Sequence, residues 1–172
     1  MALNEKKGLF VGRFQPVHKG HVKAIKYSLG KCGKLIIAVG SAQYARTADN
    51  PFSAKERIKM LKAALAESKI GKSKLGTKVT IVATTDVNSN SRWVGHMESC
   101  VPHFEIVFSN NLLVRKLFRK AGYKVESIPF YRREELEGKK IRKLMKAGDL
   151  RWKKLVPKAV SKLVEKKEKR VT

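Results

Sequence analysis

The sequence predicts an α/β fold: a Rossmann-like, doubly wound parallel sheet of about five strands, followed by C-terminal helices. Short apolar runs alternate with stretches of helical periodicity over the first 130 residues, and this alternation is typical of a parallel sheet covered on both faces. The length of 172 residues, with 42% hydrophobic and 31% charged residues, suits one core of ordinary size. We therefore expect a single domain over 1–172, with a parallel α/β core at 1–130 and a helical part at 131–172.

A β-α-β unit opens the chain. Residues 8–12 form an apolar run, Val22, Ile25 and Leu29 recur at helical spacing, and 35–39 is a second apolar run. The remaining elements are expected as a helix after a capping box at 53–56, strands at 79–83, 105–108 and 123–128, and helices at 90–100, around 113–118, at 134–146 and at 157–169.

The chain carries 39 Lys and Arg against 14 Asp and Glu, a formal net charge of +25. This field attracts any polyanion, so nucleotides, nucleic acids and anionic membrane surfaces are all candidate ligands. No run of about 18 apolar residues could span a membrane, and no export signal precedes the first strand, so we expect a cytoplasmic protein. Cys32 and Cys100 lie far apart without a C-x-x-C pattern, which predicts unbridged thiols rather than a disulfide or a zinc site.

An H-x-G-H sequence, His18 to His21, follows the first strand and opens the first helix. The unpaired N–H groups and the dipole of a helix start favour an anion at this place. A lone histidine more often indicates a packed or surface side chain, but a pair at this spacing favours a phosphate site.

Small or polar residues also follow the next three strands, at 40–43, 86–93 and 109–111. Ligands of open parallel sheets bind at the carboxyl ends of the strands, where the strand order reverses. Together with the histidine pair, these segments predict a nucleotide site at one edge of the sheet.

Two common nucleotide signatures are missing. No G-x-G-x-x-G follows the first strand. Gly71-Lys72-Ser73 resembles the tail of a phosphate-binding loop, but Ala66 stands where that loop needs its first glycine, so we interpret 71–73 as a plain surface turn.

The H-x-G-H sequence, together with a late Gly138-Lys139-Lys140-Ile141-Arg142, resembles the nucleotidylyltransferase superfamily. Within it, the whole chain is similar to the archaeal-type nicotinamide-nucleotide adenylyltransferases, above all through the Ser41-Ala42-Gln43 loop and the set Asp86, Asn90 and Trp93. The resemblance implies transfer of AMP from ATP to nicotinamide mononucleotide, giving NAD and pyrophosphate by direct in-line attack.

The same resemblance implies roles for individual residues. The expected catalytic residues are His18, His21 and Arg142. The expected ATP-binding residues are Gly12, Arg13, Phe14, His18, His21, Arg46, Gly138, Lys139, Ile141 and Arg142. The expected residues for the nicotinamide nucleotide are Phe14, Ser41, Asp86, Asn90, Trp93 and Asn110. Mg²⁺ would arrive with ATP, held by phosphate and water rather than by a protein metal site, and the protein would form a homo-oligomer, commonly a hexamer.

The late signature departs from the family pattern, which has small hydroxyl residues around its glycine. Here Glu137 and Lys139 flank Gly138. Lys139 can offer a charged donor to a phosphate, whereas a carboxylate at 137 is repelled by a triphosphate unless it faces solvent or a neighbouring cation.

Three alternatives stay open. The first is an adenylyl- or cytidylyltransferase with another phosphorylated acceptor, such as flavin mononucleotide or pantetheine phosphate, although Trp93 with Asn90 favours a nicotinamide nucleotide. The second is a nucleic-acid-binding protein on a nucleotide-binding fold, which the charge of +25 favours and the lack of an interleaved basic and aromatic track disfavours. The third is a nucleotide sensor with a weakened triphosphate site, which only Glu137 supports.

Overall fold

The computed structural model describes residues 6–73 and 76–168, and its chain divides into two compact units. The sheet unit comprises Met1–Arg13, Ala24–Gln43 and Gly71–Pro129, and the helical unit comprises Phe14–Lys23, Tyr44–Ile70 and Phe130–Thr172. Helix α1 (Lys19–Lys31) begins in the helical unit and ends in the sheet unit. The expectation of one domain over 1–172 remains a prediction.

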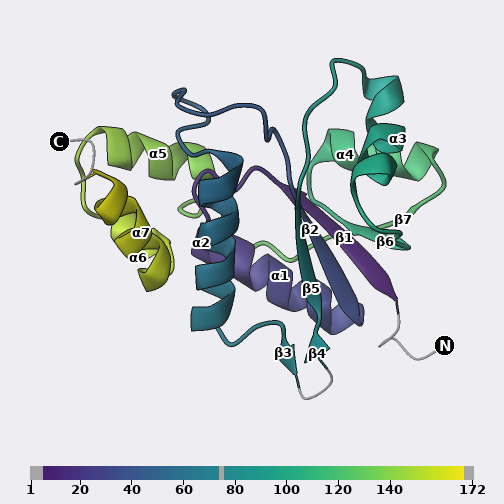
Figure 1. Cartoon of the computed structure of the whole chain (residues 1–172), viewed down its shortest axis with the longest axis horizontal. Helices are drawn as coiled ribbons and strands as arrows, with labels where there is room; N and C mark the ends of the chain where they lie inside the picture. The colour runs from purple at the N-terminus through teal and green to yellow at the C-terminus, as the bar shows by residue number, and fades with distance from the viewer. Residues whose placement is uncertain (1–5, 74–75, 169–172) are drawn as a thin grey trace. The chain divides into compact units, whose positions relative to one another are not determined.

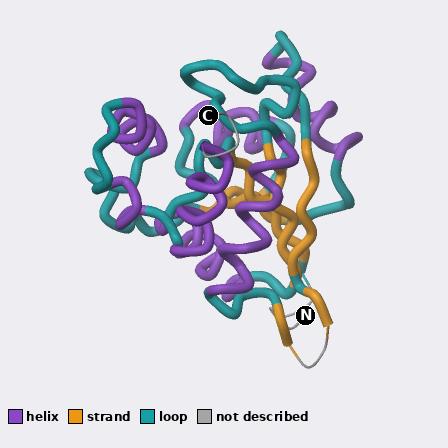
Figure 2. The backbone as a smooth tube through the Cα atoms, turned by 60° about the vertical axis from the view of Figure 1, so that its left-hand side comes forward, coloured by secondary structure: helices purple, strands orange, loops and turns teal. Residues whose placement is uncertain are grey.

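The sheet unit contains a parallel sheet whose strands come in the order β5-β2-β1-β6-β7 (Figures 1 and 2). The strands are β1 (Lys7–Gly12), β2 (Lys34–Val39), β5 (Val79–Ala83), β6 (Ile106–Phe108) and β7 (Lys124–Glu126). Every pair in this sheet is parallel. The chain winds from β1 outward through β2 to β5, then returns to the other side of β1 for β6 and β7. The doubly wound α/β fold expected from the sequence is confirmed.

The core of the sheet unit explains why its strands are continuous apolar runs. Leu9 on β1 pairs with Ile36 on β2 and Val107 on β6, and each of these side chains is buried. Helices α3 (Asn90–Cys100) and α4 (Leu112–Lys120) add Met97 and Phe118 to the same cluster. Both helices lie on the β6 and β7 side of the sheet (Figure 1).

The helical unit is built around α2 (Ala54–Glu67), α5 (Gly138–Lys146), α6 (Trp152–Leu155) and α7 (Lys158–Glu168). The expected capping box starts α2: Ser53 Oγ accepts from Glu56 N, and the Glu56 carboxylate accepts from Ser53 N. At the other end of α2, the Glu67 carboxylate accepts from the main-chain N–H groups of Lys158 and Ala159, at 3.2 and 2.6 Å. Glu67 thus caps the start of α7 with the charge that a helix N-terminus favours.

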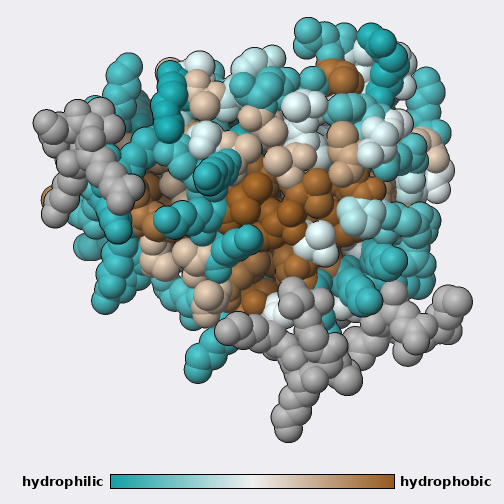
Figure 3. All heavy atoms as spheres, in the orientation of Figure 1, coloured by the Kyte–Doolittle hydropathy of each residue, from teal (hydrophilic) through white to brown (hydrophobic). Residues whose placement is uncertain are grey.

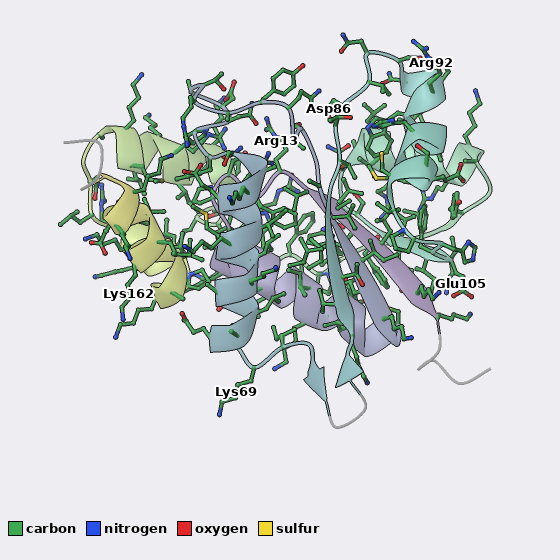
Figure 4. The ribbon with its side chains drawn as sticks, in the orientation of Figure 1. Arg13, Lys69, Asp86, Arg92, Glu105 and Lys162 are labelled. Carbon is green, nitrogen blue, oxygen red and sulfur yellow. The ribbon has the colours of Figure 1, made fainter. Side chains whose placement is uncertain are left out.

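Hydrophilic side chains gather over the outer side of the C-terminal helices (Figure 3), and Lys162 points away from α7 (Figure 4). Val160 and Val164 of α7 are buried, as their helical spacing predicts. The exposed lysines of α7, Lys158, Lys162 and Lys166, therefore form a solvated face.

The structure corrects several element boundaries. The helix expected at 134–146 starts only at Gly138, because Arg132 adopts a positive φ of 44° and its guanidinium pairs with Glu135 at 2.5 Å in a turn. Lys72–Ser73 is not a plain turn but strand β3, which pairs with β4 (Gly76–Thr77) in a small antiparallel hairpin. The expected strands at 105–108 and 123–128 are shorter, and α6 was not anticipated. The last helix begins at Lys158, and its expected end at Lys169 lies outside the described residues.

Cys32 and Cys100 are free thiols, as expected. Cys32 is buried, and burial raises the pKa of its thiol to about 11. Within residues 6–73 and 76–168, no helix combines the length and the apolar character needed to cross a bilayer.

Gly8 leaves room for the side chains of Phe108 and Cys32, and substituting it tests this part of the core. A Cβ at position 8 would lie 2.6 Å from Phe108 Cε2 and 2.9 Å from Cys32 Sγ. We predict that Gly8→Ala lowers the free energy of unfolding by about 3 kcal/mol, because overpacking displaces buried side chains. Urea unfolding followed by circular dichroism measures this loss.

Gly95→Ala is the matched control. Position 95 lies in the middle of α3, and a Cβ there would have nothing within 4 Å. This variant should gain about 0.5–1 kcal/mol from helix propensity alone. Equal destabilisation of both variants would contradict the packing argument.

Candidate active site

The two histidines of the H-x-G-H sequence cap α1 with one another. His18 stands just before the helix, and its Nδ1 accepts a hydrogen bond from the main-chain N–H of His21 at 3.3 Å. In return, Nδ1 of His21 accepts from the main-chain N–H of His18 at 3.1 Å. This is the reciprocal geometry of a capping box, with imidazoles in place of a hydroxyl and a carboxylate. The spacing of three residues therefore starts the helix and also brings the two side chains together.

The hydrogen bonds fix the chemical state of both rings. The imidazoles are stacked, with centroids 3.6 Å apart. Burial lowers the pKa of His18 to about 4, and burial together with the nearby His18 lowers the pKa of His21 well below its usual value. Both rings are therefore neutral near pH 7. Because Nδ1 of each ring is an acceptor, Nε2 of each ring carries the proton and remains a donor.

Close neighbours hold the histidine pair in place. The ring of Phe14, which is buried and has a φ of 53°, lies 4.7 Å from the ring of His21. Gly20 cannot carry a side chain without disturbance, because a Cβ there would lie 3.0 Å from the His18 ring and 3.4 Å from the Cβ of Leu136. The glycine of H-x-G-H thus lets α1 and the segment before α5 approach one another.

Arg142 of α5 is oriented from two sides. One guanidinium nitrogen donates to the main-chain oxygen of Gln15 at 3.0 Å, and the other donates to the Asp49 carboxylate at 3.2 Å. A Cβ on Gly138 would lie 3.2 Å from this guanidinium, so the glycine of the late signature makes room for the arginine. Ile141 is fully buried and anchors the helix. Gln15 lies three residues before His18, so Arg142 bonds the segment that leads into the histidine pair.

The two residues that depart from the family pattern lie at the surface. The Glu137 side chain is half exposed and pairs with Lys140 at 3.8 Å. It therefore meets the condition stated above, since it faces solvent and a neighbouring cation. Lys139 is exposed in the first turn of α5.

Arg46 is another arginine of the helical unit with an expected role at the phosphates. Its end-on nitrogens Nη1 and Nη2 donate to the two oxygens of Glu56 at 2.7 and 3.0 Å, and Nη1 also donates to the main-chain oxygen of Pro51 at 3.0 Å. A cavity of about 520 Å³ is lined by Arg46, Glu56, Lys59, Met60, Leu163, Lys166 and Lys167. One carboxylate faces four cations there, so the cavity is cationic.

The sheet unit contains a separate pocket of about 370 Å³. It is lined by Val11, Gly12, Arg13, Gly40, Ser41, Asp86, Asn90, Trp93, Met97, Asn111, Leu113, Val114 and Leu117. Arg13 and Asp86 lie at the end of the sheet where β1 and β5 finish, and Glu105 lies at the opposite end (Figure 4). The expected position at the carboxyl ends of the strands is thus observed for this pocket.

Hydrogen bonds from the loop after β2 orient Asp86. Ser41 Oγ donates to the Asp86 carboxylate at 2.6 Å. Gln43 brackets the main chain of Asp86, accepting from its N–H at 3.0 Å and donating to its oxygen at 3.2 Å. Gln43 was not expected to bind a ligand, but it orients Asp86, which was.

Trp93 and Asn111 complete the polar and aromatic parts of the pocket. Trp93 lines the pocket and packs edge-on against Phe118, with centroids 5.5 Å apart. Asn111 lines the pocket and its Oδ1 accepts from Val114 N, which caps α4. Asn110 bonds the main chain of Ile128 through both ends of its amide, at 2.6 and 2.9 Å, and its expected role toward the nicotinamide nucleotide stays a prediction.

Comparison with known proteins settles the family. A model described as cytidylyltransferase-like matches residues 9–144. The chain belongs to the cytidylyltransferase-like family. It is 45% identical to the nicotinamide-nucleotide adenylyltransferase of Pyrococcus furiosus over 160 residues, which are 93% of this chain and 83% of that protein. The resemblance inferred from the sequence is confirmed.

Solved structures of more distant proteins share the fold. A bifunctional NMN adenylyltransferase/ADP ribose pyrophosphatase from Francisella tularensis matches with a TM-score of 0.74 at 20% identity, over 94% of this chain and 49% of that one. A Francisella tularensis structure of the same description, complexed with AMP and a Mn ion, matches with a TM-score of 0.66 at 21% identity, over 90% and 44% of the two chains. This chain thus spans about half the length of those proteins.

The neutral histidine pair predicts a pH dependence of stability. Because the folded pKa of His18 lies below that of the unfolded chain, its contribution is complete above pH 6.5 and is lost as the pH falls toward about 4. The free energy of unfolding should fall with a slope that approaches about 1.4 kcal/mol per pH unit for each histidine. Urea unfolding between pH 7.5 and 5.5 measures the slope.

His18→Asn keeps an acceptor for the helix start but removes one titrating group. The variant should show a shallower slope than the parent chain over the same pH range. Identical slopes would show that the pair does not titrate as described.

Proposed function

We propose that this chain transfers AMP from ATP to nicotinamide mononucleotide, forming NAD and pyrophosphate. The observation that carries the proposal is the neutral, mutually capped histidine pair near Arg142, in a chain 45% identical to a nicotinamide-nucleotide adenylyltransferase. The pair supplies two oriented Nε2–H donors at a helix start, which suits the oxygens of a phosphate chain. No side chain of the pair needs to act as a nucleophile.

The helical unit supplies the groups for ATP. The Nε2–H groups of His18 and His21 donate to the phosphates, and His21 stabilises the charge that develops as the bond to pyrophosphate breaks. Arg142, already oriented by Gln15 and Asp49, contributes a guanidinium to the leaving pyrophosphate. Lys139 and Arg46 add charge to the outer phosphates. Because Nδ1 of each ring accepts from the main chain, each neutral imidazole still has its Nε2–H to donate to a phosphate.

The sheet unit supplies the groups for nicotinamide mononucleotide. Trp93 offers an aromatic face to the nicotinamide ring, while Asp86 and Asn90 offer an acceptor and an amide to its polar substituents. Arg13, which lines the same pocket, neutralises the phosphate that attacks ATP. The attacking oxygen forms its bond to the α-phosphorus as the bond to the β-phosphate breaks, so the enzyme aligns two substrates rather than forming a covalent intermediate.

A divalent cation fits this scheme as a companion of ATP. The described residues contain no group of three or more His, Cys, Asp or Glu that could hold a metal ion. Phosphate oxygens and water would therefore provide most of its ligands, as Mg²⁺ prefers, and the ion would supply neutralisation of the triphosphate charge.

The acceptor can be tested directly. Pyrophosphate release should be measured with ATP, Mg²⁺ and one acceptor at a time: nicotinamide mononucleotide, flavin mononucleotide or pantetheine phosphate. We expect release with nicotinamide mononucleotide at a kcat/KM far above that with the other two. Turnover with another acceptor but not with nicotinamide mononucleotide would reject the proposal, and no turnover with any of them would favour a sensor.

His21→Ala tests the donor role. Loss of one oriented donor should lower kcat by roughly a hundredfold or more, with a small change in the KM for nicotinamide mononucleotide. His103 is exposed and outside both sites, so His103→Ala is the control and should retain the parent rate. A near-normal kcat in a folded His21→Ala protein would show that the chemistry lies elsewhere.

A further inference from the structure

The Arg46 guanidinium is held through Nη1 and one hydrogen of Nη2. Glu56 occupies its end-on edge through Nη1 and Nη2, and the Pro51 main-chain oxygen takes the second hydrogen of Nη1. A guanidinium has five N–H groups in a rigid plane, so three of them are committed. The two that remain, on Nε and Nη2, lie parallel along the side-on edge.

That side-on edge is a complete fork for an anion. Two parallel N–H groups match two oxygens of a phosphate. No hydrogen bond to these two donors comes from residues 6–73 and 76–168, and 58% of the Arg46 side chain is exposed. The structure therefore holds the plane of the guanidinium while it leaves one fork available.

Glu56 is itself fixed from several directions. Its carboxylate accepts from Ser53 N at 2.7 Å as part of the capping box of α2. Lys167 of α7 lies 3.4 Å from the same carboxylate and donates to the Pro51 oxygen at 3.2 Å. The Lys167 ammonium also lies over the Phe52 ring, 4.6 Å from its centroid. Only 27% of the Glu56 side chain is exposed, so it is a firm support for Arg46.

We propose that Glu56 is a positioning residue that orients Arg46 to bind a phosphate of ATP through its side-on fork, and that Lys167 of α7 secures Glu56. This inference rests on the proposed function, in which Arg46 contacts the phosphates. The carboxylate does not repel the nucleotide, because Arg46, Lys59, Lys166 and Lys167 line the same cavity and leave it positively charged. A guanidinium that is oriented before ATP binds loses less side-chain freedom on binding.

Glu56→Gln separates positioning from simple charge. Removing a negative charge beside a triphosphate would lower the KM for ATP if only charge mattered. Positioning predicts the opposite sign: KM for ATP rises roughly three- to tenfold, while KM for nicotinamide mononucleotide is unchanged. Lys167→Met should shift KM for ATP in the same direction by a smaller factor.

Ser53→Ala is the matched control. It removes the other half of the capping box, the bond from Glu56 N to Ser53 Oγ, and leaves the Glu56 carboxylate in place. Its melting temperature should fall about as much as that of Glu56→Gln, while its KM for ATP should equal that of the parent. An equal rise in KM for both variants would overturn the proposal in favour of a purely structural role of the cap.

A double-mutant cycle with Arg46→Ala completes the test. In the Arg46→Ala background, Glu56→Gln should cause no further rise in KM for ATP. A full additional rise would show that Glu56 acts independently of Arg46 and would overturn the inference. If Arg46→Ala alone leaves KM for ATP unchanged, the placement of Arg46 at the phosphates fails instead, and the two failures are thereby distinguished.

Discussion

The mutual hydrogen bonds of His18 and His21 are the constraint on which the chemistry of the helical unit depends. A protonated imidazole has no acceptor nitrogen, so neither ring can gain a proton without giving up its bond to the helix start. The start of α1 and the neutral state of the pair therefore require one another. The same two bonds leave each Nε2–H as a donor. The two hydrogen bonds between His18 and His21 therefore determine where α1 starts, which nitrogen of each ring is protonated and which nitrogen can donate to a ligand.

A second capping box in the same unit shows why histidine stands at this place. The helix α2 starts with Ser53 and Glu56, the usual pair for this motif. A glutamate in the position of His21 would put a carboxylate at the helix start where we propose that the phosphates bind. At α2 the Glu56 carboxylate pairs with Arg46 and Lys167, which neutralise its charge. Both capping boxes provide acceptors for N–H groups at a helix start. The box of α1 uses two neutral imidazoles, whereas the box of α2 uses a hydroxyl and a carboxylate.

Much of the fold could be predicted because its signals are local. The helix at Asn90–Cys100 and the strand at Val79–Ala83 were placed at their observed bounds, since buried runs and helical spacing are read from neighbouring residues. The start of α5 was missed because Glu134 and Glu135 resemble the acidic first turn of a helix. Instead, they lie in a turn that depends on the positive φ of Arg132, and no sequence pattern predicts that φ. Similarly, α6 is too short to show a period.

The sequence predicted which types of residue gather at the candidate site, but not which residues each of them contacts. Asn110 and Asn111 are neighbours with the same side chain, yet one bonds the main chain of Ile128 and the other lines the pocket. The choice depends on which of them faces the segment that follows β7, and a single sequence does not carry that information. Gln43 and Glu56 were missed as supporting residues for the same reason, since their partners are 43 and 10 residues away.

Each candidate site is supported by hydrogen bonds within its own unit. Ser41 and Gln43 orient Asp86 inside the sheet unit, whereas Gln15, Asp49 and Glu56 orient Arg142 and Arg46 inside the helical unit. The aromatic and amide groups of one unit suit a ring with polar substituents, and the cations and imidazoles of the other suit a phosphate chain. Separate support keeps the candidate binding groups of each unit oriented without any substrate present. A reaction that joins two nucleotides without a covalent enzyme intermediate depends on this, because its rate is set by how well both substrates are held.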